Sequence, residues 1–211
     1  MRVSKSKVIL SNLCLILVSV PRVAFGQASG NAAQPPAAAD SAPTTGVRAE
    51  VTRLIDDAET KLTKLAQAIP AEKYSWRPSK DARSVSEVFL HVAGGNFAIP
   101  RRLGTEPPAD FNPKDYDKSA TDKAKVMDMM KKSFAHAKAA VAKLSEADME
   151  KTADWFGGRK ASYREIAFFV AVHEHEHMGQ SIAYARMLGI TPPWTEEQQQ
   201  KQKAQQPKPK T

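Results

Sequence analysis

The sequence predicts an all-α protein, an antiparallel four-helix bundle, from three observations. Four segments carry apolar residues at the three- and four-residue spacing of an amphipathic helix. Two of these segments begin with Ser-x-x-Glu, the capping-box pattern that starts a helix. No segment shows a convincing strand pattern. Because each apolar stripe must be buried against another element, a bundle is the simplest architecture for four such helices.

The N-terminal residues predict a secretory signal peptide. Basic residues precede an apolar run, Val8–Val20, that is too short to span a bilayer. The small residues Ala24 and Gly26 then fit a cleavage site before Gln27, and an uncleaved membrane anchor is the alternative. We therefore expect residues 1–26 to be removed. The mature protein would be periplasmic or secreted, without stable membrane insertion.

Composition limits the chemistry and the partners of the mature chain. The only cysteine, Cys14, lies in the predicted signal, so the mature protein would have no thiol. A disulfide framework and a cysteine nucleophile are thereby excluded, and a metal would need nitrogen or oxygen ligands. The formal net charge of +8 falls to +4 when the four basic residues of the signal leave, and no basic stripe is evident. Nucleic acid is therefore not an expected partner.

Composition also separates two flexible segments from one folded domain. Residues 27–46 are rich in Ala and Pro with a single charge, and residues 196–211 are rich in Gln, Lys and Pro. Neither segment can bury enough apolar area to offset its ordering entropy. We expect a linker at 27–46, the helical bundle at 47–195 and a disordered tail at 196–211.

The first two helices have clear boundary signals. The first covers residues 47–68 and ends before Pro70, which cannot continue it. The second starts at the capping box Ser84-x-x-Glu87 and directs His91 inward with its apolar residues. Gly94-Gly95 in this second helix indicates a close helix contact, a kink or an early end.

The last two helices follow two irregular connections. Residues 104–120 contain three prolines, and we expect this segment to be either a lid or disordered. The third helix follows at 121–144. A turn with aromatic flanks at 154–160 leads to a second capping box, Ser162-x-x-Glu165. It opens the fourth helix, which ends at Gly189.

Three of the chain's five histidines lie close together in the fourth helix. His173 and His177 lie about 40° apart around a helix, one turn apart on the same face, and can clamp one metal ion. His175 lies about 200° from His173 and points the other way. The missing ligand must therefore come from another element.

His91 is the best candidate for the third ligand. It lies among the inward-facing residues of the second helix, whereas His136 is predicted to lie on the surface. A lone histidine on an apolar stripe is usually a hydrogen-bonded core residue, and this is the alternative for His91. Three neutral imidazoles suit one divalent transition metal such as Zn, Ni, Cu or Fe, and they leave a coordination position open.

Several motifs occur in a specific order along residues 47–194. They are Trp76-Arg77-Pro78, Ser84-Val85-Ser86-Glu87 followed by His91, His173-Glu174-x-x-His177-Met178-Gly179-Gln180, and Tyr184-x-Arg186-x-x-Gly189-Ile190-x-Pro192-Pro193. Together these motifs resemble the DinB-like superfamily. The resemblance implies a four-helix bundle with one divalent metal held by His91, His173 and His177, often in a homodimer.

Members of this superfamily include thiol-dependent S-transferases and isomerases. Two features of the chain depart from the resemblance. Predicted export makes a low-molecular-weight thiol cofactor less expected. His175-Glu176 also stands where relatives often have a small residue and another histidine.

The sequence thus predicts an exported metal-binding protein that acts on a small molecule as a hydrolase or transferase. A non-catalytic metal-binding helical module is the alternative. A zinc protease is a third hypothesis, because His173-Glu174-x-x-His177 matches H-E-x-x-H, with Glu174 as general base. The extended protease motif would need Gly and His where this chain has Gln180 and Ala183.

Glu176 and Gln180 are the candidate catalytic residues beside the metal. They lie three residues after His173 and His177 respectively, so each could reach the metal site or orient a ligand histidine. The alternative for both is an exposed side chain on the solvated flank of the helix.

Overall fold

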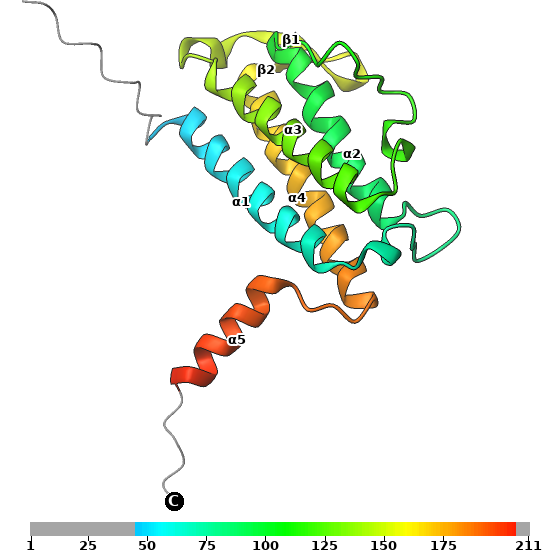
Figure 1. Ribbon diagram of the computed structural model, residues 1–211. Helices are drawn as coiled ribbons and strands as arrows, with labels where there is room; N and C mark the ends of the chain where they lie inside the picture. Colours follow the sequence, from blue (N-terminus) through cyan, green and yellow to red (C-terminus); the bar gives the residue numbers. More distant parts are fainter. Residues whose placement is uncertain (1–44, 206–211) are drawn as a thin grey trace, which may run out of the picture. The chain divides into compact units, whose positions relative to one another are not determined.

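Four long helices pack together in the computed structural model, which describes residues 45–205. They are α1 (Val47–Ala68), α2 (Val85–Ala98), α3 (Lys123–Ala142) and α4 (Tyr163–Met187). Both α1 and α2 contact α3 and α4, and Figure 1 shows the four helices side by side. The predicted all-α four-helix bundle is confirmed. The predicted signal peptide, and the predicted linker up to residue 44, lie outside the described residues.

Capping interactions fix where α2 and α4 begin. At α2 the Glu87 backbone N–H donates to Ser84 Oγ at 3.3 Å, and the Ser84 N–H donates to Glu87 Oε2 at 2.7 Å. This is a complete capping box. At α4 the Glu165 N–H donates to Ser162 Oγ at 3.1 Å, but the Glu165 carboxylate pairs with Arg159. The second predicted capping box is therefore only half formed.

The apolar stripes of the helices form a common core. Its largest fully buried aliphatic and aromatic side chains include Ile55, Leu62, Leu65, Phe89, Phe134 and Ile166. Burying each such side chain stabilises the fold by roughly 1.5–3 kcal/mol. Asn96, Ser133 and Glu174 are also buried, and Asn96 Nδ2 donates to Ser133 Oγ at 3.4 Å. The interior next to α4 is therefore partly polar.

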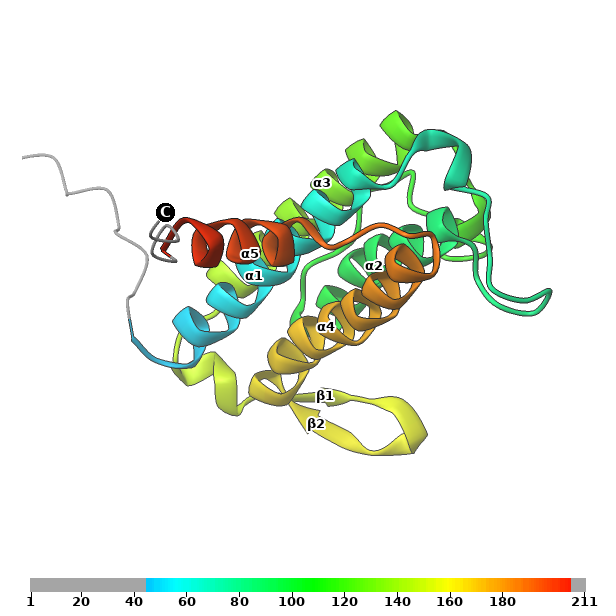
Figure 2. The ribbon, with the colours of Figure 1, turned by 90° about the horizontal axis from the view of Figure 1, so that it is seen from below.

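A small hairpin precedes α4, where the sequence predicts only a turn. Strands β1 (Thr152–Asp154) and β2 (Lys160–Ser162) pair antiparallel, with Ala153 opposite Ala161. The turn between them includes Gly157, whose φ of 73° favours glycine. Figure 2 shows the hairpin beside the start of α4. Strands of three residues are too short for an alternating pattern to reveal them in the sequence.

The connection between α2 and α3 packs against α2. The Phe111 and Tyr116 rings lie 5.0 Å apart, and both lie near Phe97 of α2, at 5.3 and 6.1 Å. These aromatic contacts hold the middle of the segment 104–120 against α2. This packing does not agree with the disordered alternative for the segment.

A fifth helix, α5 (Pro193–Gln205), begins at the second proline of the pair that follows α4. The sequence predicts a disordered tail from residue 196 onward. No α5 residue is buried, and Lys64 Nζ of α1 donates to Glu197 Oε1 at 2.8 Å. The lack of an apolar stripe explains why no helix was expected there. None of the helices between residues 45 and 205 has the length and apolarity needed to cross a membrane.

Candidate metal centre

Three histidines from two helices meet at one point. His91 projects from α2, and His173 and His177 project from successive turns of α4. One ring nitrogen of each histidine lies within 4.8 Å of those of the other two. The His91 and His173 rings have centroids 4.5 and 4.7 Å from the His177 ring. The structure thus brings the three candidate ligands together, and they could hold a metal ion.

The spacing of two ring nitrogens fits a metal site. Nε2 of His91 lies 3.3 Å from Nε2 of His173. A tetrahedral zinc ion with bonds of about 2.0–2.1 Å would hold two nitrogens about 3.3 Å apart. Without a metal, the same spacing lets one ring donate a hydrogen bond to the other. The spacing of this pair is therefore compatible with two ligands of one metal ion.

Gly95 permits the close approach of α4 to α2. A Cβ atom at this position would overlap the His173 ring and would lie 2.7 Å from Nδ1. Helix α2 also continues beyond both glycines to Ala98. Of the three possibilities for Gly94-Gly95, the structure shows the close helix contact.

Gln180 orients the His177 ring. Oε1 of Gln180 lies 2.9 Å from Nδ1 of His177, and Nε2 of Gln180 donates to the Tyr184 hydroxyl at 3.1 Å. Because the amide oxygen accepts, Nδ1 carries the proton and Nε2 keeps a lone pair for a metal. Gln180 therefore has the geometry of a residue that positions a ligand histidine.

Burial keeps two of the three histidines neutral. It lowers the pKa of His91 to about 4, with a further contribution from the nearby Arg83 guanidinium. It lowers the pKa of His173 to about 3, with further contributions from His177 and His91. Neutral imidazoles are the form that binds a metal, so these two rings are ready to do so at neutral pH.

A cavity of about 440 Å³ is lined by His91 and His173. Its other lining side chains include Arg83, Phe111, Tyr116, Asp117, Phe156 and Phe169. The volume is in the range of small-molecule sites. These other lining residues come from four separate segments and share no sequence pattern, so they are not predictable as a group from the sequence. The aromatic turn that contains Phe156 was their only sequence signal.

Glu176 does not line this cavity. Its side chain is exposed and borders a different hollow, with Leu54 and His175. His175 faces α1, where its Nε2 lies 3.5 Å from Asp57 Oδ2. The expectation that His175 points away from the metal ligands therefore agrees with the structure.

Glu174 lies in the core of the bundle. Its side chain is fully buried, and neither carboxylate oxygen has a hydrogen-bond partner among residues 45–205. Burial, with a smaller contribution from the nearby Glu59, raises the pKa of Glu174 to about 9. At neutral pH this carboxyl is protonated and does not line the histidine cavity. The zinc-protease hypothesis therefore lacks its general base.

His136 is partly buried, and the prediction of a surface histidine is wrong. Its ring centroid lies 5.3 Å from that of Phe97, and its buried Nε2 has no partner in the described part of the chain. Burial lowers its pKa. The position of His136 around its own helix does not reveal this contact, because Phe97 belongs to the neighbouring helix α2.

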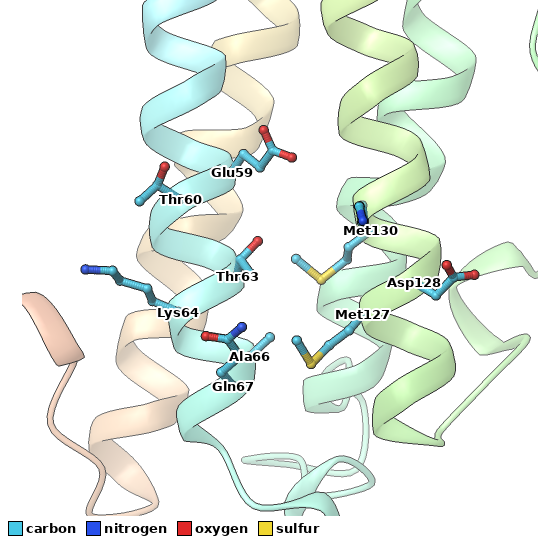
Figure 3. Close-up of a pocket in the computed structure, with 10 residues that line it drawn as sticks. Glu59, Thr60, Thr63, Lys64, Ala66, Gln67, Met127, Asp128 and Met130 are labelled. Atoms are coloured by element: carbon cyan, nitrogen blue, oxygen red, sulfur yellow. The ribbon is translucent and has the colours of Figure 1, made fainter.

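A second hollow of about 560 Å³ lies between α1 and α3 (Figure 3). Met127 and Met130 of α3 face α1 across it, and Glu59 and Lys64 are among the polar residues at its edge. Its lining residues include no histidine. The histidine cavity is therefore the stronger candidate for a functional site.

The family model of the DinB superfamily matches residues 54–181. The chain belongs to the DinB superfamily. This confirms the family that the sequence motifs resemble, and the matched region includes all three histidines of the cluster. A comparison with curated proteins found no match.

Solved structures with this DinB fold are similar to the chain at low identity. A DinB-like protein from Bacillus cereus shares 19% identity, with a TM-score of 0.59, over 68% of this chain and 93% of that protein. A putative DinB family member from Exiguobacterium sibiricum shares 21% identity, with a TM-score of 0.55, over 69% and 93%. A mycothiol-dependent maleylpyruvate isomerase shares 12% identity, with a TM-score of 0.53, over 62% and 59%. At these identities the similarity shows the fold alone.

Proposed function

We propose that this DinB-superfamily protein is an exported enzyme that holds one divalent transition metal ion through His91, His173 and His177. It would act on a small molecule as a metal-dependent hydrolase or transferase. The observation that supports this proposal is the meeting of three imidazoles beside a cavity. Three protein ligands with a free fourth position are typical of catalytic zinc sites, whereas structural zinc sites have four.

When bound, such an ion supplies Lewis-acid chemistry to a substrate in the cavity. The chain's own residues prepare the site. Gln180 fixes the His177 tautomer through its 2.9 Å hydrogen bond. Burial keeps His91 and His173 unprotonated. The aromatic side chains of Phe156 and Phe169 give the cavity an apolar part of its lining.

Hydrolysis is our first choice of reaction class. The expected export of the protein disfavours a low-molecular-weight thiol cofactor, and the expected mature chain has no thiol of its own. Thiol transfer is the second candidate, because the mycothiol-dependent isomerase has a similar fold. A non-catalytic metal-binding module is the remaining alternative.

An activity screen distinguishes these three candidates. Zinc-loaded protein covering residues 27–211 would be assayed against small esters, lactones and amides, and against an electrophile with a thiol. We expect turnover that is lost in His177→Ala and retained in His136→Ala, whose histidine lies outside the cluster. Turnover only with added thiol would favour transfer. Bound zinc without any turnover would favour the non-catalytic module.

Export and assembly are separate parts of the proposal. Mass spectrometry of protein from the periplasmic fraction of a bacterial host should show a chain that begins at Gln27. Full-length protein confined to the cytoplasm would contradict export. We also propose a homodimer, which light scattering of the purified protein would test.

A further inference from the structure

Arg83 places a partly unsatisfied guanidinium at the histidine cavity. Its Nε donates to Asp117 Oδ2 at 3.3 Å, and its side chain is 40% exposed. Within the described residues, its two terminal nitrogens take part in no hydrogen bond or ion pair. Arg83 is the only arginine or lysine among the residues that line the cavity.

A guanidinium with free terminal nitrogens selects a planar oxyanion. Its two parallel N–H groups match the two oxygens of a carboxylate. Asp117 offsets part of the Arg83 charge through the Nε contact alone. A phosphate dianion would need a second cation, and the cavity lining contains no lysine. A single carboxylate is therefore the better match.

Aromatic rings form the apolar side of the cavity. Phe156, in the turn of the hairpin, is 65% exposed, and its ring centroid lies 6.1 Å from that of Phe169. The Phe169 ring stacks on His173 at 6.4 Å, with an interplanar angle of 27°. The rings thus extend from the hairpin to a candidate metal ligand. A flat apolar group could pack against them.

We infer that the cavity binds a small planar carboxylate, whose carboxylate contacts Arg83 and whose flat body packs against Phe156 and Phe169. Its reacting group would then lie beside His91 and His173, the two histidines of the cluster that line the cavity. This inference rests on the proposed metal-dependent function, because the histidines mark the end of the cavity where the reaction would occur.

Hydroxamic acids provide probes with a defined metal-binding end. The affinity of zinc-loaded protein would be measured by calorimetry for benzohydroxamic acid and for its 3-carboxy and 4-carboxy derivatives. We expect at least one carboxy derivative to bind about tenfold more tightly than the parent, because a charge-assisted hydrogen bond to Arg83 is added. Acetohydroxamic acid, which lacks the ring, should bind more weakly than all three.

Two variants test whether Arg83 causes the preference for a carboxylate and whether Phe156 causes the preference for an aromatic ring. Arg83→Gln should abolish the advantage of the carboxy derivatives and leave the affinity for benzohydroxamic acid unchanged. Phe156→Ser should weaken the aromatic probes and leave acetohydroxamic acid unaffected. Arg101→Gln is the matched control, because Arg101 is exposed, pairs with Glu106 and does not line the cavity. Circular dichroism would verify that each variant folds.

The outcomes separate this inference from the proposed function. Equal affinities for the parent and both carboxy derivatives would overturn the inference alone. An advantage that persists in Arg83→Gln would do the same. Failure of the protein to bind zinc, or of zinc-loaded protein to bind any hydroxamate, would overturn the proposed function and the inference with it.

Discussion

Nε2 of His91 and Nε2 of His173 lie 3.3 Å apart, although 82 positions separate the two residues in the chain. The contact exists because α2 and α4 pack closely where Gly95 leaves room for the His173 ring. The packing of two helices, rather than a local motif, therefore completes the candidate metal centre.

Gly95→Ala should disrupt this centre. A Cβ atom at position 95 would overlap the His173 ring, so the ring or the helix must move. We expect zinc affinity to fall by at least tenfold, measured by competition with a chromophoric chelator. Gly179→Ala is the matched control on α4, because nothing lies within 4 Å of its added Cβ. That variant should bind zinc normally and gain about 0.5–1 kcal/mol of stability from its helical alanine. Unchanged affinity in Gly95→Ala would show that the histidine positions do not depend on this contact.

Gln180→Ala should weaken metal binding without removing a ligand. It deletes the acceptor that holds the His177 Nδ1 proton, and the loss of such a partner typically costs 10–100-fold in metal affinity. The same chelator competition would measure the effect, with Gln67→Ala, an exposed glutamine of α1, as the control. Equal affinities in the two variants would contradict the orienting role of Gln180.

Glu174→Gln should stabilise the metal-free protein at high pH. The pKa of Glu174 is raised from 4.5 to about 9 in the folded protein. Below pH 4.5 the carboxyl is protonated in both the folded and the unfolded state, so its burial does not lower the stability of the wild type. As the pH rises from 4.5 through 9, the unfolded state loses this proton first, and the wild type progressively loses stability. We expect the variant's advantage over the wild type in free energy of unfolding to grow by roughly 5 kcal/mol between pH 4.5 and pH 8. The difference should shrink toward pH 4.5.

Urea denaturation at pH 5, 6.5 and 8 would measure this difference. Glu72→Gln, at an exposed position, is the control and should show no such trend. A difference between Glu174→Gln and the wild type that is constant with pH would indicate that Glu174 is not protonated in the folded protein.

Removal of metal should lower thermal stability. A ligand that binds only the folded state at 100 times its dissociation constant stabilises by about 2.7 kcal/mol, or about 5–10 °C in a domain of this size. Zinc added to chelator-treated wild type should raise the melting temperature by this amount. His177→Ala should show no increase, whereas His175→Ala, whose histidine faces α1, should respond as the wild type does. Equal responses of the two variants would place the metal elsewhere.

The sequence predicted the bundle and the histidine cluster because both leave regular spacings. Residues His173 and His177 share a helix face by their four-residue separation, and His91 lies on the inward stripe of α2. The start of α2 was predictable because Ser84 and Glu87 satisfy free backbone groups through local contacts alone.

Features that depend on tertiary contacts were not predictable from the sequence. The Arg83 and Phe156 side chains reach the cavity from separate loops, and no spacing links them. His136 is partly buried only because Phe97 of another helix covers it. The helix α5 has no buried face, so its sequence resembled a flexible tail.

The metal content of purified protein tests the central claim most directly. Mass-spectrometric metal analysis would compare the wild type with His91→Ala, His177→Ala and the control His136→Ala, each exposed to one equivalent of zinc and then desalted. We predict roughly one ion per chain in the wild type and the control, and almost none in the other two variants. Undiminished metal in both His91→Ala and His177→Ala would contradict the three-histidine centre.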